Sequence, residues 1–86
     1  MYKVVYVDQV EEDLKKLDKS AARKILARIE TYLACNPQEL GKPLKGSFQG
    51  FWRYRWGNYR VIYKISEKEI LILILRKIAI SIKSIL

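Results

Sequence analysis

The chain has 86 residues, with 17 Lys and Arg against 9 Asp and Glu, and a formal net charge of +8. This length allows one modest hydrophobic core, so we expect residues 1–86 to form a single domain. Half of the residues are apolar, which excludes a disordered tail, and the excess of positive charge favours polyanionic partners such as nucleic acid or an acidic protein.

The cysteine and histidine content excludes several kinds of site. Cys35 is the only cysteine and histidine is absent, so internal disulfides, ordinary zinc sites and histidine-based triads are excluded, and no metal or cofactor is expected. We expect Cys35 to be a small buried thiol beside a helix end. No export signal follows Met1, and the apolar run Ile70–Leu75 is much shorter than the roughly 20 residues of a membrane span. A cytoplasmic protein without a membrane partner is therefore expected.

The first half of the chain predicts a strand followed by two helices. Tyr2–Val7 alternates around Lys3, as strands do, and Asp8 with Glu11 forms an Asp-x-x-Glu signal for the start of a helix. Asp18 is expected to cap a second helix, which ends before Asn36-Pro37. The apolar stripe of this helix consists of Ala22, Ile25, Leu26, Ile29 and Leu33. The side chains expected largely on its outer side are Arg23, Lys24 and Arg28.

The second half predicts a loop and a three-stranded meander. Residues 36–50 contain both prolines and three of the four glycines, as loops do. From Phe51 onward the pattern has period two, Gly57-Asn58 is a favoured hairpin turn, and Tyr59–Ile65 and Ile70–Leu75 are the next strands. The aromatic residues expected to face the helices are Trp52, Tyr54, Trp56, Tyr59 and Tyr63. The order strand, helix, helix, strand, strand, strand predicts an α+β fold with two N-terminal helices on a mainly antiparallel sheet.

The register of the hairpin predicts a cluster of cations on the other face of the sheet. With Gly57 and Asn58 as the two loop residues, Arg55 lies opposite Arg60, and Arg53 shares their face. Like charges directly across an antiparallel pair destabilise it, and no acidic residue of the strand pair offsets them. Two interpretations remain: a solvated face that protects the sheet from edge pairing, or a face built for an anion, because guanidinium groups match phosphate.

The same register can be extended into the last strand and the preceding loop. Without a bulge, it predicts Leu71, Leu73, Leu75 and Lys77 on the side of Arg60, and Arg76 on the opposite side. Lys42 and Lys45 precede the arginine strand and are expected at the rim of the same concavity, either as ligands of the anion or as ordinary solvated lysines.

Three stretches of the chain resemble the central signature of RelE-type toxins, in the RelE/ParE superfamily. They read GKPLKG over residues 41–46, GFWRYR over residues 50–55 and GNYRVIY over residues 57–63. The resemblance covers about residues 1–75. It implies a type II toxin–antitoxin toxin that cleaves messenger RNA in the ribosomal A site by attack of a ribose 2′-hydroxyl on its neighbouring phosphate. It also implies an acidic antitoxin as partner, and it allows a homodimer or a heterotetramer with the antitoxin.

The resemblance assigns the catalytic role to Arg53, Arg55 and Arg60. Lys77 is a further catalytic candidate, and Lys42, Lys45 and Arg76 are RNA-binding candidates. A ParE-like toxin acting on DNA gyrase is a second hypothesis, although gyrase inhibition gives no obvious reason for the arginine cluster.

The tail, residues 76–86, departs from the family pattern. Ile78 takes the position of the usual catalytic arginine, and no tyrosine follows Tyr63. Three explanations stay open: Arg76 or Lys77 substitutes for that arginine, the protein is an inactive homologue that still binds an antitoxin or RNA, or the tail is a frameshifted ending. The alternation within residues 78–86 predicts a strand with one apolar side that an antitoxin segment or a second copy covers.

Overall fold

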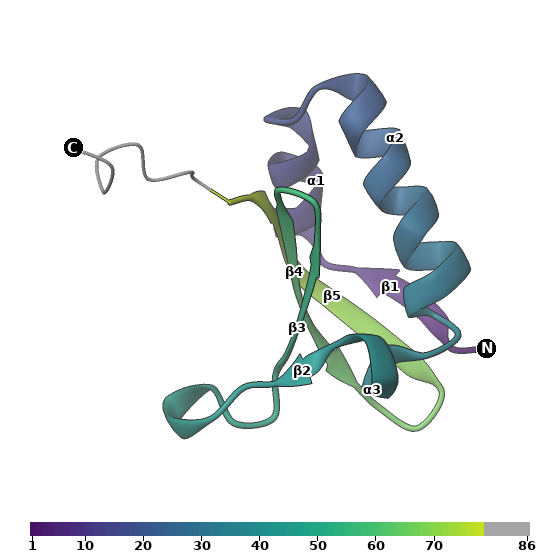
Figure 1. Cartoon of the computed structure of the whole chain (residues 1–86), viewed down its shortest axis with the longest axis vertical. Helices are drawn as coiled ribbons and strands as arrows, with labels where there is room; N and C mark the ends of the chain where they lie inside the picture. The colour runs from purple at the N-terminus through teal and green to yellow at the C-terminus, as the bar shows by residue number, and fades with distance from the viewer. Residues whose placement is uncertain (79–86) are drawn as a thin grey trace.

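The computed structural model describes residues 1–78 and has the expected α+β architecture (Figure 1). The helices are α1 (Asp8–Lys15), α2 (Lys19–Arg28), which continues as a π-helical turn over Ile29–Leu33, and α3 (Pro37–Leu40). The strands are β1 (Lys3–Tyr6), β2 (Lys42–Pro43), β3 (Trp52–Trp56), β4 (Tyr59–Ile65) and β5 (Glu69–Lys77). A 3₁₀ turn over Gly46–Phe48 lies between β2 and β3. Both α1 and α2 lie on one side of the sheet, as predicted.

The second helix begins and packs as its sequence predicts. The Asp18 carboxylate accepts hydrogen bonds from the backbone N–H groups of Ser20 at 3.1 Å and Ala21 at 3.4 Å, which satisfies donors that a helix N-terminus leaves free. Three members of the predicted stripe are fully buried: Ile25, Ile29 and Leu33. Together with Val10 of α1 they cover the inner face of the sheet. This packing leaves the outer face of the sheet without a helix over it.

The sheet has the order β1-β5-β4-β3-β2, and only the β1–β5 pair is parallel. The hairpin between β3 and β4 has the predicted register, with Arg55 opposite Arg60 and Arg53 opposite Ile62. Gly57 adopts a φ of 58°, and within residues 1–78 only glycines have a positive φ. A glycine in the first central position of a two-residue loop fixes such a register.

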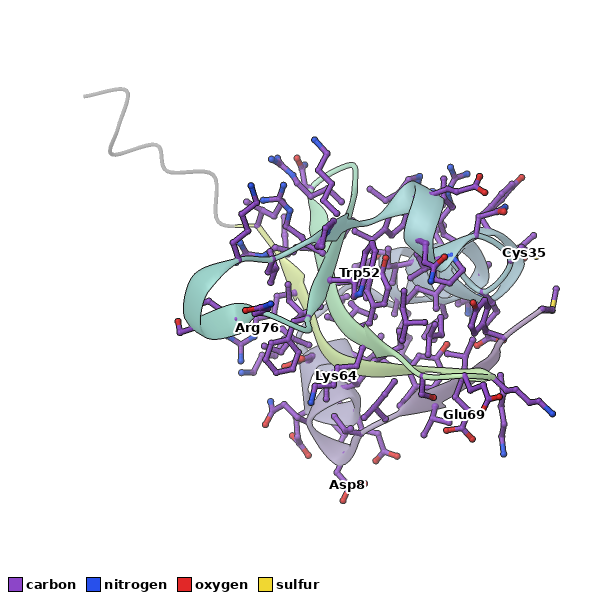
Figure 2. The ribbon with its side chains drawn as sticks, turned by 90° about the horizontal axis from the view of Figure 1, so that it is seen from below. Asp8, Cys35, Trp52, Lys64, Glu69 and Arg76 are labelled. Carbon is purple, nitrogen blue, oxygen red and sulfur yellow. The ribbon has the colours of Figure 1, made fainter. Side chains whose placement is uncertain are left out.

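The aromatic residues of β3 and β4 face the helices, as predicted. Tyr54 and Tyr63 are buried, and Trp52, Trp56 and Tyr59 pack against the same core. Figure 2 shows Trp52 among the side chains between the strands and the helices, with Arg76 on the other side of the sheet. These rings therefore pack on the helix side of the sheet, opposite to the face that carries the arginines.

A β-bulge in β5 overturns the predicted faces of the last strand. Tyr63 pairs with Ile72 but Ile62 pairs with Ile74, so Leu73 is an extra residue in β5. The bulge exchanges the two faces beyond this point. Arg76 therefore lies opposite Arg60 and shares its face, whereas Leu75 is in the core and Lys77 lies opposite Tyr59. The predictions for Leu75, Arg76 and Lys77 were wrong; those for Leu71 and Leu73 hold.

Two predictions near the helices also need correction. The first residue of α1 is Asp8 itself, so Asp8 and Glu11 lie in the first turn and no side chain caps this helix. Cys35 is exposed and lies at the surface in Figure 2, because its neighbour Ala34 takes the buried position at the helix end.

Arg28 was expected on the outer side of α2 but packs against aromatic rings. Its Nε donates to the Tyr54 hydroxyl at 2.9 Å, and its guanidinium carbon lies 4.1 Å from the centroid of the Tyr32 ring. The side chain thus contacts one ring of the sheet, Tyr54, and one ring of the helical turn that continues α2, Tyr32.

The region expected to be a loop, residues 36–50, contains α3, β2 and the 3₁₀ turn. The strand predicted for residues 78–86 lies, apart from Ile78, outside the described residues. No helix within residues 1–78 has both the length and the apolar character to cross a membrane. The same residues contain no group of three or more Cys, Asp or Glu placed to hold a metal ion.

Candidate functional site

Three arginines occupy opposed positions, here called the arginine row, on adjacent strands of the outer face of the sheet. Arg55 of β3 lies opposite Arg60 of β4, and Arg60 lies opposite Arg76 of β5 on its other side. A second row runs beside it, in which Lys42 of β2 lies opposite Arg53 of β3. Like charges in directly opposed positions destabilise a sheet, so this arrangement favours the binding of an anion to this face.

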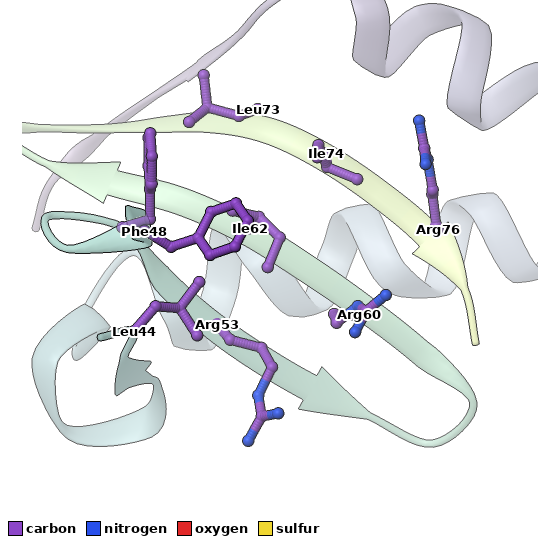
Figure 3. Close-up of a pocket in the computed structure, with 9 residues that line it drawn as sticks. Leu44, Phe48, Arg53, Arg60, Ile62, Leu73, Ile74 and Arg76 are labelled. Carbon is purple, nitrogen blue, oxygen red and sulfur yellow. The ribbon is translucent and has the colours of Figure 1, made fainter. Parts of the chain in front are cut away.

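The cations border a concavity of about 520 Å³ in this face (Figure 3). Its polar lining consists of Arg53, Arg60 and Arg76. Its apolar lining consists of Leu44, Phe48, Phe51, Ile62, Leu73 and Ile74. Phe48 is 60% exposed, so its ring is accessible in this hollow. A hollow with guanidinium groups at one side and aromatic rings at the other fits a phosphate and an unstacked base.

The structure brings together most, but not all, of the residues predicted for the site. Arg53 and Arg60 line the concavity, and Arg55 and Lys42 are their cross-strand neighbours. Lys45 lines a neighbouring hollow with Pro43, Gly46 and Gln49, and this hollow shares Leu44 and Phe51 with the concavity. Lys45 is directed there because the chain turns away from β3 after Leu44. Lys77 is on the other face of β5, so Arg76 is the residue of this pair that belongs to the arginine row.

Sequence reasoning missed the two phenylalanines of the concavity, Phe48 and Phe51. Their signal was weak: two aromatic residues among the polar and glycine residues that precede the arginine strand. Lys64 of β4 lies over the ring of Phe51, with Nζ 4.8 Å from the ring centroid.

Sequence reasoning also missed Asp13 of α1, the buried carboxylate next to the arginine row. Strand β1 covers the edge of β5 only as far as Ile72, so the N–H of Leu75 has no strand partner on that side. Asp13 Oδ2 accepts this N–H at 3.1 Å, and Oδ1 accepts from Gln9 Nε2 at 3.0 Å. The Nε of Arg76 lies 3.8 Å from the same Oδ1. The available signal was an acidic residue three positions after Val10 on the apolar stripe of α1.

Replacing Asp13 by Ala should lower the free energy of unfolding by about 1–3 kcal/mol, because the buried N–H of Leu75 loses its acceptor. Denaturant unfolding followed by circular dichroism measures this change. Glu11→Ala is the matched control, since Glu11 is an exposed carboxylate on the same helix. Equal free energies of unfolding for Asp13→Ala and Glu11→Ala would show that the hydrogen bond from Leu75 to Asp13 does not stabilise the fold.

Tyr63, the last tyrosine of the chain, is directed away from the concavity. Its hydroxyl donates to the carbonyl of Pro37 at 2.6 Å on the helix side of the sheet. Burial, with a smaller contribution from Tyr54, raises the pKa of the Tyr63 hydroxyl above its usual range. Within residues 1–78, no tyrosine lines the concavity.

Comparison with known proteins identifies the family. Residues 4–77 match the family described as ParE toxin of type II toxin-antitoxin system, parDE. Toxin RelE of Mycobacterium tuberculosis is 33% identical over 66 residues, covering 77% of this chain and 68% of that protein. Toxin RelG of the same organism is 32% identical over 79 residues, covering 87% and 86%. The crystal structure of the toxin-antitoxin complex RelBE2 from M. tuberculosis matches with a TM-score of 0.86 and 27% identity, over 88% of this chain and 96% of that one. The chain therefore belongs to the RelE/ParE superfamily, the toxins of type II toxin–antitoxin systems.

Proposed function

We propose that this toxin is an endoribonuclease that cleaves messenger RNA in the ribosomal A site. The observation that supports this proposal most is the row Arg55–Arg60–Arg76 beside Arg53, at the edge of an apolar concavity. Such a row is costly in the empty protein and becomes favourable when a phosphate group occupies it. The similarity to RelE and RelG toxins agrees with this activity.

In the proposed reaction, a ribose 2′-oxygen forms a bond to the adjacent phosphorus as the bond from phosphorus to the 5′-oxygen breaks. The 2′-hydroxyl gives its proton to water and the departing 5′-oxygen takes one from water, which leaves a 2′,3′-cyclic phosphate and a 5′-hydroxyl. Guanidinium groups remain protonated in proteins, so Arg53 and Arg60 stabilise the negative charge on the phosphorane and do not act as bases. Arg76 shares the face of Arg60, so in this proposal it has the catalytic role that was expected for Lys77.

The proposed partner is an acidic antitoxin. The net charge of +8 favours an acidic protein, and the similar M. tuberculosis structure is a toxin-antitoxin complex. An antitoxin that covers the outer face of the sheet would supply carboxylates to the arginine row and exclude RNA. Because the proposed target is the ribosome, we place the protein in the cytoplasm.

Induction of the chain in a bacterial host without an antitoxin should stop growth and truncate messages within translated regions. The control is the Arg53→Gln, Arg60→Gln double variant at the same expression level, which should permit growth. The two measurements are culture density and mapping of RNA 5′ ends. Normal growth with intact messages at full expression would contradict the proposal and favour an inactive homologue.

The family match itself favours a second candidate, inhibition of DNA gyrase, because the matched family is described by the ParE toxin. The same induction distinguishes the two. A gyrase inhibitor would change plasmid supercoiling while messages remain intact, and its effect would persist in the Arg53→Gln, Arg60→Gln variant.

A further inference from the structure

Arg76 stands on a ridge between two hollows of the molecule. On one side it lines the concavity of the outer face, here called the arginine concavity, together with Arg53 and Arg60. On the other side it borders a smaller hollow of about 350 Å³, where α1 meets the end of β5. The lining of this second hollow consists of Asp13, Lys16, Leu17, Leu75, Arg76 and Lys77. Figure 3 shows the Arg76 side chain directed away from Arg60, although the two residues are direct cross-strand neighbours.

The Asp13 carboxylate is fixed, whereas its cationic partner is not. The Asp13 side chain is 1% exposed, and both of its oxygens accept other hydrogen bonds, one from Leu75 N–H and one from Gln9. The Arg76 side chain is 58% exposed, and its Nε lies 3.8 Å from Asp13 Oδ1, which is beyond hydrogen-bond distance. Arg76 can therefore leave this contact without any change in the backbone or in the other bonds of Asp13.

We propose that Asp13 is a positioning residue that holds Arg76 at the ridge until an RNA phosphate in the arginine concavity takes over as its partner. This inference rests on the proposed function, because the competing anion is the RNA phosphate. In the empty protein, Asp13 offsets the charge of Arg76 and lowers its repulsion with Arg60. In the complex, the phosphate supplies that negative charge, and Arg76 completes the row Arg55–Arg60–Arg76.

A consequence is that Asp13 competes with RNA for the same guanidinium. The buried carboxylate thus weakens RNA binding by the resting toxin while it stabilises the end of β5. The two roles are separable by chemistry, since the β5 edge needs only a hydrogen-bond acceptor and the hold on Arg76 needs a negative charge.

The variant Asp13→Asn separates them. Its amide oxygen still accepts the N–H of Leu75, and its NH₂ group faces Gln9, whose own amide can rotate to present an oxygen. The same NH₂ group replaces the acceptor near Arg76 by a donor, so the guanidinium is released. Glu11→Gln is the matched control, because it removes one negative charge from an exposed position on the same helix.

The experiment measures the affinity of each variant for a short single-stranded RNA with a 2′-deoxy nucleotide at the cleavage position. Asp13→Asn should bind about fivefold more tightly than Glu11→Gln, the scale of an ion pair with one exposed partner. Adding Arg76→Gln should abolish this gain. In the RNA-free protein, the NMR resonance of the Arg76 Nε–H group should move in Asp13→Asn and stay in place in Glu11→Gln.

The outcomes distinguish the two proposals. Equal affinities of Asp13→Asn and Glu11→Gln, a gain that persists with Arg76→Gln, or an unmoved Arg76 resonance would overturn the positioning role alone. A wild-type chain that neither binds this RNA nor cleaves message on ribosomes would instead contradict the proposed function.

Discussion

Replacing Arg60 by Gln should reduce messenger RNA cleavage about 100-fold, equivalent to about 3 kcal/mol of transition-state stabilisation by one preorganised donor. The same change should leave the free energy of unfolding unchanged or slightly raised. Arg60 lies between Arg55 and Arg76, and neither ion pair found within residues 1–78 includes it. The rate of messenger RNA cleavage should therefore fall while the free energy of unfolding does not. This combination is expected for a residue that destabilises the sheet but serves the reaction.

Cleavage rates on ribosomes and thermal unfolding of the same preparations test this expectation. Lys68→Gln is the matched control, because it removes one positive charge from an exposed residue in the turn between β4 and β5 that does not line the concavity. That variant should keep its cleavage rate. An Arg60→Gln protein with a lower melting temperature and undiminished cleavage would show that Arg60 is structural.

Replacing Gly41 by Ala should destabilise the fold by roughly 2–5 kcal/mol, through overpacking and the loss of a buried hydrogen bond. A Cβ at this position would collide with the Tyr63 hydroxyl oxygen and would lie 3.1 Å from the carbonyl oxygen of Arg53. The backbone of Gly41 is extended, with φ −95°, so the cost arises from this contact and not from the conformation. A loss of this size is a large fraction of the stability of a small domain.

Denaturant unfolding of a double-mutant cycle with Tyr63→Phe tests the cause. The hydroxyl that collides with the new Cβ is absent in Phe, so Gly41→Ala should cost at least about 1 kcal/mol less in that background. The Tyr63→Phe variant alone should lose stability, because the carbonyl of Pro37 loses its donor. Equal costs of Gly41→Ala in both backgrounds would rule out this contact as the cause.

The hairpin and its arginines could be predicted from sequence because two independent signals agree there. Gly57-Asn58 fixes the loop, and the alternation of aromatic and cationic residues in β3 marks the two faces. The last strand has no such mark. Every residue of Ile70–Leu75 is apolar, so the sequence gives no sign of the bulge at Leu73 that moves Arg76 onto the arginine face and Lys77 off it.

The remaining parts of the site depend on tertiary contacts that no local pattern contains. The Asp13 carboxylate has a backbone partner because β1 ends before β5 does, which leaves the N–H of Leu75 without a strand partner. Lys42 lies opposite Arg53 because the loop after α3 returns to the edge of β3 as a two-residue strand. Gly41 is the first residue of the GKPLKG stretch. A glycine is favoured there because the Cβ of any other residue would collide with the buried Tyr63 hydroxyl.

The most direct test of the central claim is an end analysis of message on purified ribosomes stalled at a defined codon. Addition of the chain should produce one cut within the A-site codon, with a 2′,3′-cyclic phosphate on the upstream fragment and a 5′-hydroxyl on the downstream one. The Arg53→Gln, Arg60→Gln variant should produce none. Message that stays intact on these ribosomes at a stoichiometric amount of the wild-type chain would contradict the account.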